Sequence, residues 1–399
     1  MKNKNSVVLL SCLLINNVTS MFIYTYLLAF ILDISSNGIL NVATFYCSLH
    51  VSMIAFSWLF APLFKKIKKS NILSFGIFFK CIFILMVGIF KDSIINYIIL
   101  IALFNAASEV LFWGGANPLL PIITQKNKLV SFMSAHKILG NIISIIVPII
   151  MGYFIDVSGI NVVALIIGIL ITIQLLLSFC ISEEDTKKRN KPHFREFVNS
   201  IKLNYPKAKK IYVNLFLFGF CSNISTIMLY YTVVTFGSNI SLGIFSTISS
   251  IIGIIVLLIF NYKRKYFSTY TSFIIFSSLM LVSVIFVLIE LSKVSLIIFY
   301  LIWNISIIIP DTITGSLRLN IIKRKGLTEY NIENVTISET YLDAGRIIGE
   351  ILLLIMGVAN SRVIDVLCLV ITTIGVVIFF IYTSIINKQS SSISTITKA

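Results

Sequence analysis

Several acidic residues lie inside long apolar segments of this 399-residue chain, where an unpaired charge is costly. A charged side chain at the centre of a bilayer costs roughly 2.5–3.5 kcal/mol on insertion scales, so it persists where it faces a cavity or a partner. Carboxylates in such a setting suit the uptake and release of protons. The candidate proton-coupling residues are Glu109, Asp311, Asp343, Arg346 and Glu350.

Three of these residues share one helical face. Asp343, Arg346 and Glu350 are spaced by three and four residues, which spreads them over about 10 Å of helix axis. Arg346 is able to pair with either acid but not fully with both, which leaves a surplus negative charge. The pattern predicts a switch in which Arg346 exchanges acids as Glu350 takes and releases a proton. The alternative is a packing cluster in which one acid stays protonated, and the sequence leaves both open.

Glu109 and Asp311 lie at similar depths in two other apolar segments. Two acids in a cavity of low dielectric would suit proton exchange and would attract a cationic solute. Glu109 has a structural alternative, a static ion pair with a lysine. Asp311 follows Pro310, so it has the alternative of a broken helix end, where it would accept backbone N–H groups. Lys80, in the middle of its own apolar segment, has no assigned role beyond reaching an acid on a neighbouring helix.

A second set of polar residues consists of asparagines and tyrosines in apolar segments. An asparagine there usually forms hydrogen bonds between helices, worth about 0.6 kcal/mol on average. Contact with a substrate is the other interpretation, and tyrosine rings could wall a site for a cation or an amphiphile. The substrate-cavity candidates are Asn16, Asn17, Tyr24, Asn105, Asn223, Tyr230 and Asn304.

The composition excludes a water-soluble protein. The chain is 57% hydrophobic and 12% charged, with a mean hydropathy of +0.98. Strict alternation of apolar and polar residues is absent, so the spans are expected to be helices in an all-α integral membrane protein. Twelve spans are predicted, at 7–33, 39–63, 72–90, 94–116, 132–155, 160–181, 211–236, 240–261, 268–289, 295–316, 337–358 and 363–386.

The first half of the chain recurs in the second. The segment from Asn17 to Tyr24 returns at Asn223 to Tyr230, and Gly140 to Gly152 returns at Gly345 to Gly357. The repeat predicts two six-helix bundles, both in the same orientation and related by a pseudo-twofold axis along the membrane normal. The expected domains are an N-terminal bundle over 1–182, a basic cytoplasmic linker over 183–210, and a C-terminal bundle with a short cytoplasmic tail over 211–399.

The basic residues predict the orientation. If both termini are cytoplasmic, 26 of the 32 lysines and arginines lie in cytoplasmic segments. The net charge of +16 then indicates contact with anionic lipid headgroups rather than nucleic acid. His136 and Lys137, near the cytoplasmic start of a span, are expected to snorkel or to contact lipid phosphate. In the linker, an apolar stripe that includes Phe197 and Ile201 favours a short helix in the headgroup region, with a solvated linker as the alternative.

With its predicted spans, duplication and charged central loop, the chain resembles the major facilitator superfamily. The loop 61–70 retains the basic character and Leu63 of the family pattern G-x-L-a-D-r-x-G-r-r but lacks its aspartate and glycines. In the fifth span, Pro148 and Gly152 match part of the antiporter signature G-P-x-x-G-G. The resemblance implies a central cavity lined by spans one, four, seven and ten, and the partial signature favours efflux.

Small residues recur in the fifth and eleventh spans. They are expected to give smooth faces on which helices pack closely and slide during alternating access. These gating and packing candidates are Gly140, Ser144, Pro148, Gly152, Gly345, Gly349 and Gly357.

The function expected from these features is secondary active transport across the cytoplasmic membrane. The leading hypothesis is proton-coupled efflux of an amphiphilic or cationic small molecule by a monomer, and the alternative is a proton-coupled importer of a sugar, peptide or organic ion. A membrane-embedded enzyme is disfavoured, because His50, His136 and His193 are scattered along the chain. The sequence contains no nucleotide-binding motif. Its cysteines are not spaced as metal ligands, so neither a cofactor nor a metal is expected.

Overall fold

The structure is a computed structural model of the whole chain. It describes residues 2–123, 129–182, 192–263, 269–290, 292–322, 327, 329–359 and 361–396. Within these residues the backbone is helical and contains no strand, as the pattern of apolar spans predicts. The predicted loops around Lys126, Lys128 and Lys323, and most of the basic linker at 183–191, lie outside the described residues.

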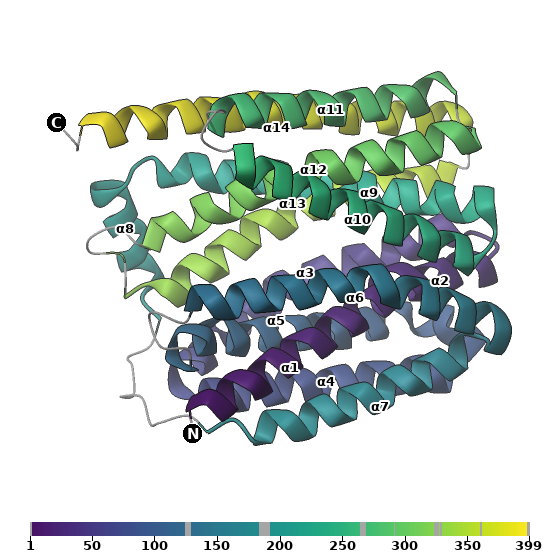
Figure 1. Cartoon of the computed structure of the whole chain (residues 1–399), viewed down its shortest axis with the longest axis horizontal. Helices are drawn as coiled ribbons and strands as arrows, with labels where there is room; N and C mark the ends of the chain where they lie inside the picture. Colours follow the sequence, from purple (N-terminus) through teal and green to yellow (C-terminus); the bar gives the residue numbers. More distant parts are fainter. Residues whose placement is uncertain are drawn as a thin grey trace. The chain divides into compact units, whose positions relative to one another are not determined.

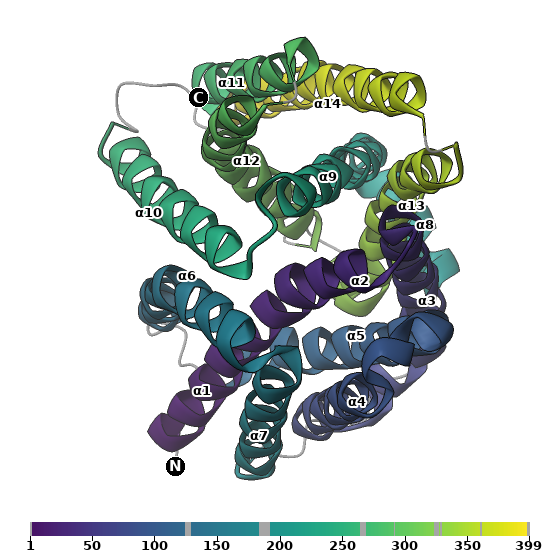
Figure 2. The same ribbon diagram turned by 90° about the vertical axis from the view of Figure 1, so that its right-hand side faces the viewer.

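The helices form two compact units. Unit 1 comprises Met1–Pro192 and Gly237–Thr247, and unit 2 comprises His193–Phe236 and Ile248–Ala399. Figure 2 views many of the helices of each unit nearly end-on, and they gather as bundles. Each α-helix pairs the backbone polar groups of its interior within itself, as hydrocarbon requires, and each bundle packs such helices together.

In unit 1, α4 packs against α5 and α7, α3 packs against α5, and α1 packs against α6 and α7 (Figure 1). The first transmembrane segment is interrupted by a π-helical turn, η1. The elements are α1 (Lys2–Met21), η1 (Phe22–Leu27), α2 (Leu28–Ile34), α3 (Gly38–Lys66), α4 (Lys69–Phe90), η2 (Lys91–Tyr97), α5 (Ile98–Ile123), α6 (Leu129–Ser158) and α7 (Ile160–Phe179).

In unit 2, α9 packs against α12, α13 and α14, and α11 packs against α12 and α14. The helix α10 begins in unit 1 and continues into unit 2. The elements are α8 (Phe194–Asn204), α9 (Ala208–Phe236), α10 (Asn239–Lys263), α11 (Thr269–Ile289), α12 (Lys293–Ile322), α13 (Asn331–Ala359) and α14 (Arg362–Ile396).

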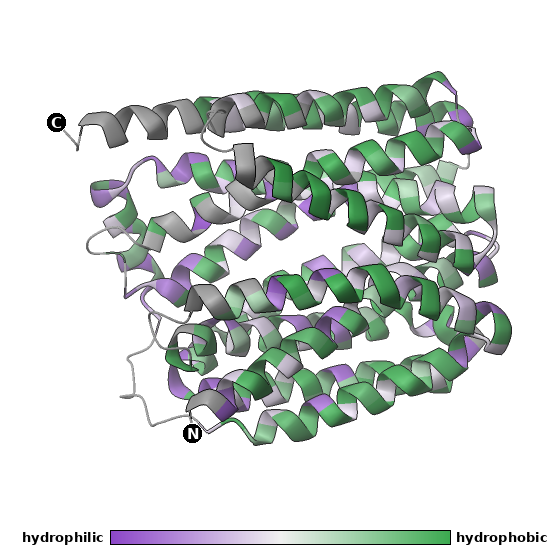
Figure 3. Cartoon of the chain, viewed as in Figure 1, coloured by the Kyte–Doolittle hydropathy of each residue, from purple (hydrophilic) through white to green (hydrophobic). Residues whose placement is uncertain are grey.

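The distribution of polarity is that of a protein in lipid. Large apolar side chains such as Leu85, Leu165 and Phe179 are exposed, whereas Lys80 and Gln174 are fully buried. Figure 3 shows apolar residues along the length of the helices and hydrophilic residues concentrated toward their ends. An exposed apolar surface of this extent needs a hydrocarbon environment.

Among the described residues, nine helical segments are long and apolar enough to cross a membrane, and two shorter apolar segments accompany them. The nine are Lys4–Ile34, Gly38–Lys66, Lys69–Phe90, Ser93–Leu120, Ala135–Ser158, Ile160–Phe179, Ala208–Phe236, Asn239–Val256 and Arg362–Ile386, and the shorter two are Ser278–Ile289 and Lys293–Ile307. The number of twelve spans stays a prediction, with which these helices agree.

The helix predicted in the central linker is present as α8. Its apolar side does not lie free for a lipid surface, because Phe197 and Ile201 are buried in a cluster with Ile211, Leu215 and other residues of unit 2. The carboxylate of Glu333 on α13 accepts a hydrogen bond from the backbone N–H of His193, at 2.9 Å. The alternative of a fully solvated linker is therefore wrong for this segment, and the helix is part of unit 2.

The start of α10 is held by α6 within unit 1. The Asp156 carboxylate accepts hydrogen bonds from the backbone N–H groups of Asn239, at 3.3 Å, and Ile240, at 3.1 Å. These N–H groups lie at the helix N-terminus, where they have no partner within the helix and where negative charge is favoured. A Cβ atom on Gly152 would lie 2.4 Å from the carbonyl oxygen of Asn239, so only glycine permits this approach.

Glycines also bring α13 against α9 inside unit 2. A Cβ atom on Gly345 would lie 1.9 Å from the carbonyl oxygen of Phe216, and one on Gly219 would lie 2.0 Å from that of Leu342. The close packing predicted for Gly345 is thus observed, but its partner is a helix of the same unit. Two backbones at this separation gain extensive van der Waals contact, which is the main attraction between helices in lipid.

We therefore expect Gly345→Ala to destabilise unit 2 by about 1–3 kcal/mol, the usual cost of forcing extra atoms into a packed interface. Thermal unfolding of the purified protein in detergent measures the change. Gly88→Ala in α4 is the matched control, because no atom lies within 4 Å of the added Cβ position. Equal unfolding temperatures for the two variants would show that the close contact between α9 and α13 does not contribute to stability.

Candidate functional site

A fully buried lysine and a buried glutamate form an ion pair in unit 1. Lys80 on α4 donates to Glu109 Oε1 on α5 at 2.8 Å and to Asn16 Oδ1 on α1 at 2.6 Å. The Trp113 indole N–H donates to the other carboxylate oxygen, Glu109 Oε2, at 3.0 Å. The Lys80 ammonium also lies 5.3 Å from the centroid of the Phe112 ring. The ammonium group of Lys80 therefore connects α4 to both α1 and α5.

This network explains Lys80, for which the sequence offered no role beyond reaching an acid on a neighbouring helix. Both oxygens of Glu109 are engaged, and the lysine cancels its charge. A buried pair is stable only if further hydrogen bonds satisfy its remaining atoms, and Asn16 and Trp113 supply them. The geometry favours the structural interpretation of Glu109 over a proton-carrying one, and Asn16 serves the same network.

A second charged cluster lies on α13 in unit 2. Arg346 Nη1 donates to Asp343 Oδ1 at 2.9 Å, and the same helix carries the buried Glu350. The other oxygen of Asp343 has no hydrogen-bond partner among the described residues, although Asp343 is fully buried. One turn earlier, Glu339 pairs with Arg318 of α12 at 2.7 Å. The trio of Asp343, Arg346 and Glu350 carries one more acid than base, as the spacing predicts.

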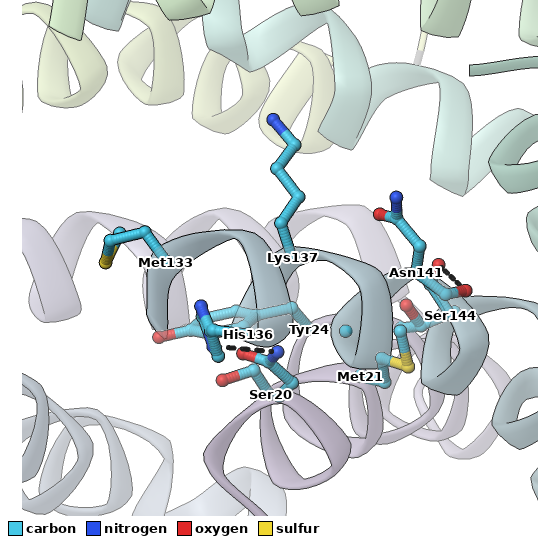
Figure 4. A pocket seen from close by; sticks show the side chains of 11 residues that line it. Ser20, Met21, Tyr24, Met133, His136, Lys137, Asn141 and Ser144 are labelled. Atoms are coloured by element: carbon cyan, nitrogen blue, oxygen red, sulfur yellow. Dashed lines mark hydrogen bonds between the residues drawn. The ribbon is translucent and has the colours of Figure 1, made fainter. Parts of the chain in front are cut away.

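A cavity of about 620 Å³, lined by both apolar and polar side chains, lies between α1 and α6 in unit 1. Asn17 and His136 are in contact in its lining, with 3.5 Å between Asn17 Nδ2 and His136 Nε2. Figure 4 shows the Lys137 side chain extending away from α1, on the same side of α6 as Asn141. The lining residues are Asn17, Ser20, Met21, Tyr24, Thr25, Met133, His136, Lys137, Gly140, Asn141 and Ser144.

The structure places four candidates from the sequence at this cavity. Asn17 and Tyr24 were proposed as substrate contacts, and Gly140 and Ser144 as packing residues. The contribution of His136 and Lys137 was missed, because both residues were assigned to lipid. A signal was present, because Lys137, Asn141 and Ser144 are spaced by four and three residues, which places three polar side chains on one side of α6.

The remaining asparagine and tyrosine candidates do not gather at one place. Asn105 is fully buried in α5, and neither of its amide atoms has a hydrogen-bond partner among the described residues. Asn223 on α9 donates to the carbonyl oxygen of Gly349 on α13 at 2.5 Å, as expected of an asparagine that joins helices. Tyr230 packs against Tyr231, with ring centroids 5.2 Å apart. The side chain of Asn304 lies outside the described residues.

Asp311 does not lie at a broken helix end. The helix α12 continues through Pro310, and Asp311 is exposed on it. It therefore differs in exposure from Glu109, its expected counterpart, which is buried. The alternative role of Asp311 as a helix cap is wrong, because no helix begins there.

The packing candidates of α6 and α13 lie in close contacts within their own units. The carbonyl oxygen of Pro148 accepts a hydrogen bond from the Tyr26 hydroxyl and lies near Gly243 of α10. Gly349 faces Asn223, and Gly357 is buried in α13. Their role in motion between the units stays a prediction.

A sequence model described as the Major Facilitator Superfamily matches residues 5–324. The chain belongs to this superfamily, and it is a multi-pass membrane transporter. The resemblance noted from the predicted spans and the duplication is thereby confirmed. No curated protein sequence matches the chain at a significant level.

Solved transporter structures share the fold. The nucleoside transporter NupG is similar with a TM-score of 0.67 and 12% identity, covering 96% of this chain and 98% of its own. A bacterial homologue of the human lysosomal transporter Spinster, in an inward-facing and unoccupied conformation, gives 0.67 and 11%, covering 97% and 98%. A bacterial homologue of the iron transporter ferroportin, in an inward-facing state, gives 0.64 and 12%, covering 95% and 98%. At these identities the likeness establishes the fold alone.

The ion pair of unit 1 makes a direct prediction. Lys80→Met leaves the Glu109 charge buried without its cation, and we expect a loss of about 3–5 kcal/mol in the free energy of unfolding. The double variant Lys80→Met/Glu109→Gln removes both charges and is expected to recover most of that loss. Thermal and denaturant unfolding in detergent provide the measurement.

Lys202→Met on α8 is the control for this experiment, because Lys202 is exposed and outside the network. It should unfold like the unsubstituted protein. If the double variant had no higher free energy of unfolding than Lys80→Met alone, the two charges would not stabilise each other. The structural interpretation of the ion pair would then be contradicted.

Proposed function

We propose that the protein is a proton-coupled secondary transporter that exports a small solute across the cytoplasmic membrane, with both termini in the cytoplasm. The observation that carries the coupling is the buried acid-rich cluster on α13, where Asp343 and Glu350 share one helical face with Arg346. Membership of the Major Facilitator Superfamily supports transport driven by a gradient rather than by nucleotide hydrolysis. Protons are the coupling ion for which the described residues offer a carrier.

The proton step would take place on α13. Arg346 holds Asp343 at 2.9 Å, and Glu350 lies one turn further along the same face. When Glu350 is protonated, the trio is electrically neutral, and it suits a bilayer interior. When Glu350 releases its proton, Arg346 has two carboxylates to serve and is drawn toward the second. Proton release would then change the packing between α13 and α9, two helices whose glycines allow them to lie in close contact.

Export rests on weaker support than coupling. Pro148 and Gly152 retain part of the antiporter signature, and Gly152 allows α6 to approach the start of α10. Import of a nutrient is the second candidate, and it is favoured by the amides and hydroxyls that line the cavity of unit 1.

The expectation of a cationic substrate loses its main argument. It depended on two acids, Glu109 and Asp311, and Lys80 cancels the charge of the first. The cavity of unit 1 presents His136 and Lys137 instead, which do not attract a cation. The names of the three structural neighbours mention nucleosides, a lysosomal transporter and iron, and this diversity transfers no substrate to the present chain. Contact of the basic loops with anionic lipid, and a monomeric state, remain part of the proposal.

The proton-coupling proposal predicts the behaviour of Glu350→Gln. In proteoliposomes with a trapped pH-sensitive dye, a panel of small solutes should reveal compounds that drive proton flux through the unsubstituted protein. For such a compound, Glu350→Gln is expected to reduce the proton flux at least about tenfold, because glutamine does not release a proton at this position. Glu290→Gln, at the exposed end of α11, is the matched control and should leave the flux unchanged. Flux that persists in Glu350→Gln would contradict the assignment of this residue.

A further inference from the structure

We propose that the cavity between α1 and α6 holds the negatively charged group of a small organic solute against Lys137, so that the transported compound is an organic anion. This inference rests on the proposed transport function and adds the chemical class of the substrate. It is carried by the position of Lys137 at the cavity, by the absence of an ion pair to Lys137 among the described residues of unit 1, and by the polar groups that line the cavity.

The charge of Lys137 is not neutralised within unit 1. Among the described residues of this unit, no carboxylate forms an ion pair with Lys137. Two acids of the same unit have other tasks, since Glu109 pairs with Lys80 and Asp156 accepts hydrogen bonds from the start of α10. Lys137 thus differs from Lys80, the buried lysine of the same unit, whose charge is cancelled inside the protein.

Lys137 is exposed at the cavity, and a cation that has no ion-pair partner among the described residues of its own unit favours binding of an anion. Lys137 is one of the residues that line the cavity, and Figure 4 shows its side chain extended away from α1. Attraction between opposite charges increases as the dielectric constant falls, so a solute carboxylate or phosphate is held more strongly here than in water. The imidazole of His136, on the preceding residue of α6, offers a further nitrogen at the same level of the cavity.

The other lining groups match an organic solute rather than a simple ion. Asn17, Asn141 and Ser144 present amide and hydroxyl groups that both donate and accept hydrogen bonds. Met21 and Met133 add flexible apolar contacts that adapt to different shapes. A cavity of about 620 Å³ lies within the usual range for binding sites of small organic molecules.

An anionic group could also reach Lys137 from a lipid headgroup. A headgroup phosphate needs the cation but makes no use of the amides and hydroxyls of the lining, whereas a solute with a carboxylate and polar substituents engages both. We therefore assign the cavity to a soluble organic anion, and the test separates it from lipid.

The test compares solutes that differ in charge but little in size. Full-length protein in an uncharged maltoside detergent is titrated with glucuronate, glucose and glucosamine, and in a second series with benzoate, benzamide and benzamidine. Calorimetry gives the dissociation constants. In at least one series the anion is expected to bind at least about tenfold more tightly than its neutral and cationic counterparts. The absence of any anion preference in both series would overturn the proposal.

Substitutions locate the preference. Lys137→Gln is expected to abolish the tenfold preference, Lys137→Arg to retain it, and Lys202→Gln, which removes an exposed charge outside the cavity, to leave it intact. A preference that survives in Lys137→Gln would also overturn the proposal. In phosphatidylcholine nanodiscs, addition of phosphatidylglycerol should not displace the anion. Displacement that disappears in Lys137→Gln would assign the site to lipid instead.

These results are separate from those that test transport. Lys137→Gln is judged by equilibrium binding in detergent, and Glu350→Gln by proton flux in vesicles. If binding showed no preference for anions while proton flux still depended on Glu350, the substrate class would be wrong and the transport mechanism would stand. If the dependence on Glu350 were lost while anion binding stayed intact, the transport mechanism would be wrong and the substrate class would stand.

Discussion

The ion pair between Lys80 and Glu109 sets the electrostatic pattern on which the rest of the structure depends. In a lipid environment no water solvates a buried charge, so each one must be cancelled inside the protein or left where it has a use. Unit 1 cancels this pair completely, with Asn16 and Trp113 satisfying its remaining atoms. Among the described residues, Lys137 at a cavity and the acid-rich trio of α13 therefore stand out as candidates for function.

Close contact between helices gives these charges a rigid setting. Glycines allow α13 to lie directly against the backbone of α9, and they allow α6 to approach the start of α10. Packed helices of this kind move between discrete arrangements rather than deforming continuously. A change of charge on α13 would then be transmitted as a movement of the helix, which is how proton release at Glu350 would alter the shape of unit 2.

Much of the fold could be predicted from the sequence, because span length, composition and the internal repeat are properties of the chain itself. The apolar stripe of α8, which includes Phe197 and Ile201, predicted a helix correctly. Its partner was not predictable, since the stripe is compatible equally with lipid and with the core of unit 2. The local pattern also did not reveal that Gly345 faces a helix of its own unit.

The site was less predictable for the same physical reason. Glu109 and Asp311 have similar sequence surroundings, yet one is buried against a lysine of another helix and the other is exposed. Which helix lies beside an acid depends on tertiary packing, and so does whether Lys137 meets lipid or a cavity. Only the trio on α13 could be predicted directly, because Asp343, Arg346 and Glu350 belong to a single helix whose period fixes their relation.

The central claim is that the paired charges of unit 1 are structural and the acid-rich trio of unit 2 is functional. The most direct test measures solute-driven proton flux in vesicles for two neutralised proteins, Lys80→Met/Glu109→Gln and Asp343→Asn/Arg346→Gln/Glu350→Gln. We expect flux to persist in the first and to be abolished in the second. Flux lost in the first and retained in the second would contradict this claim.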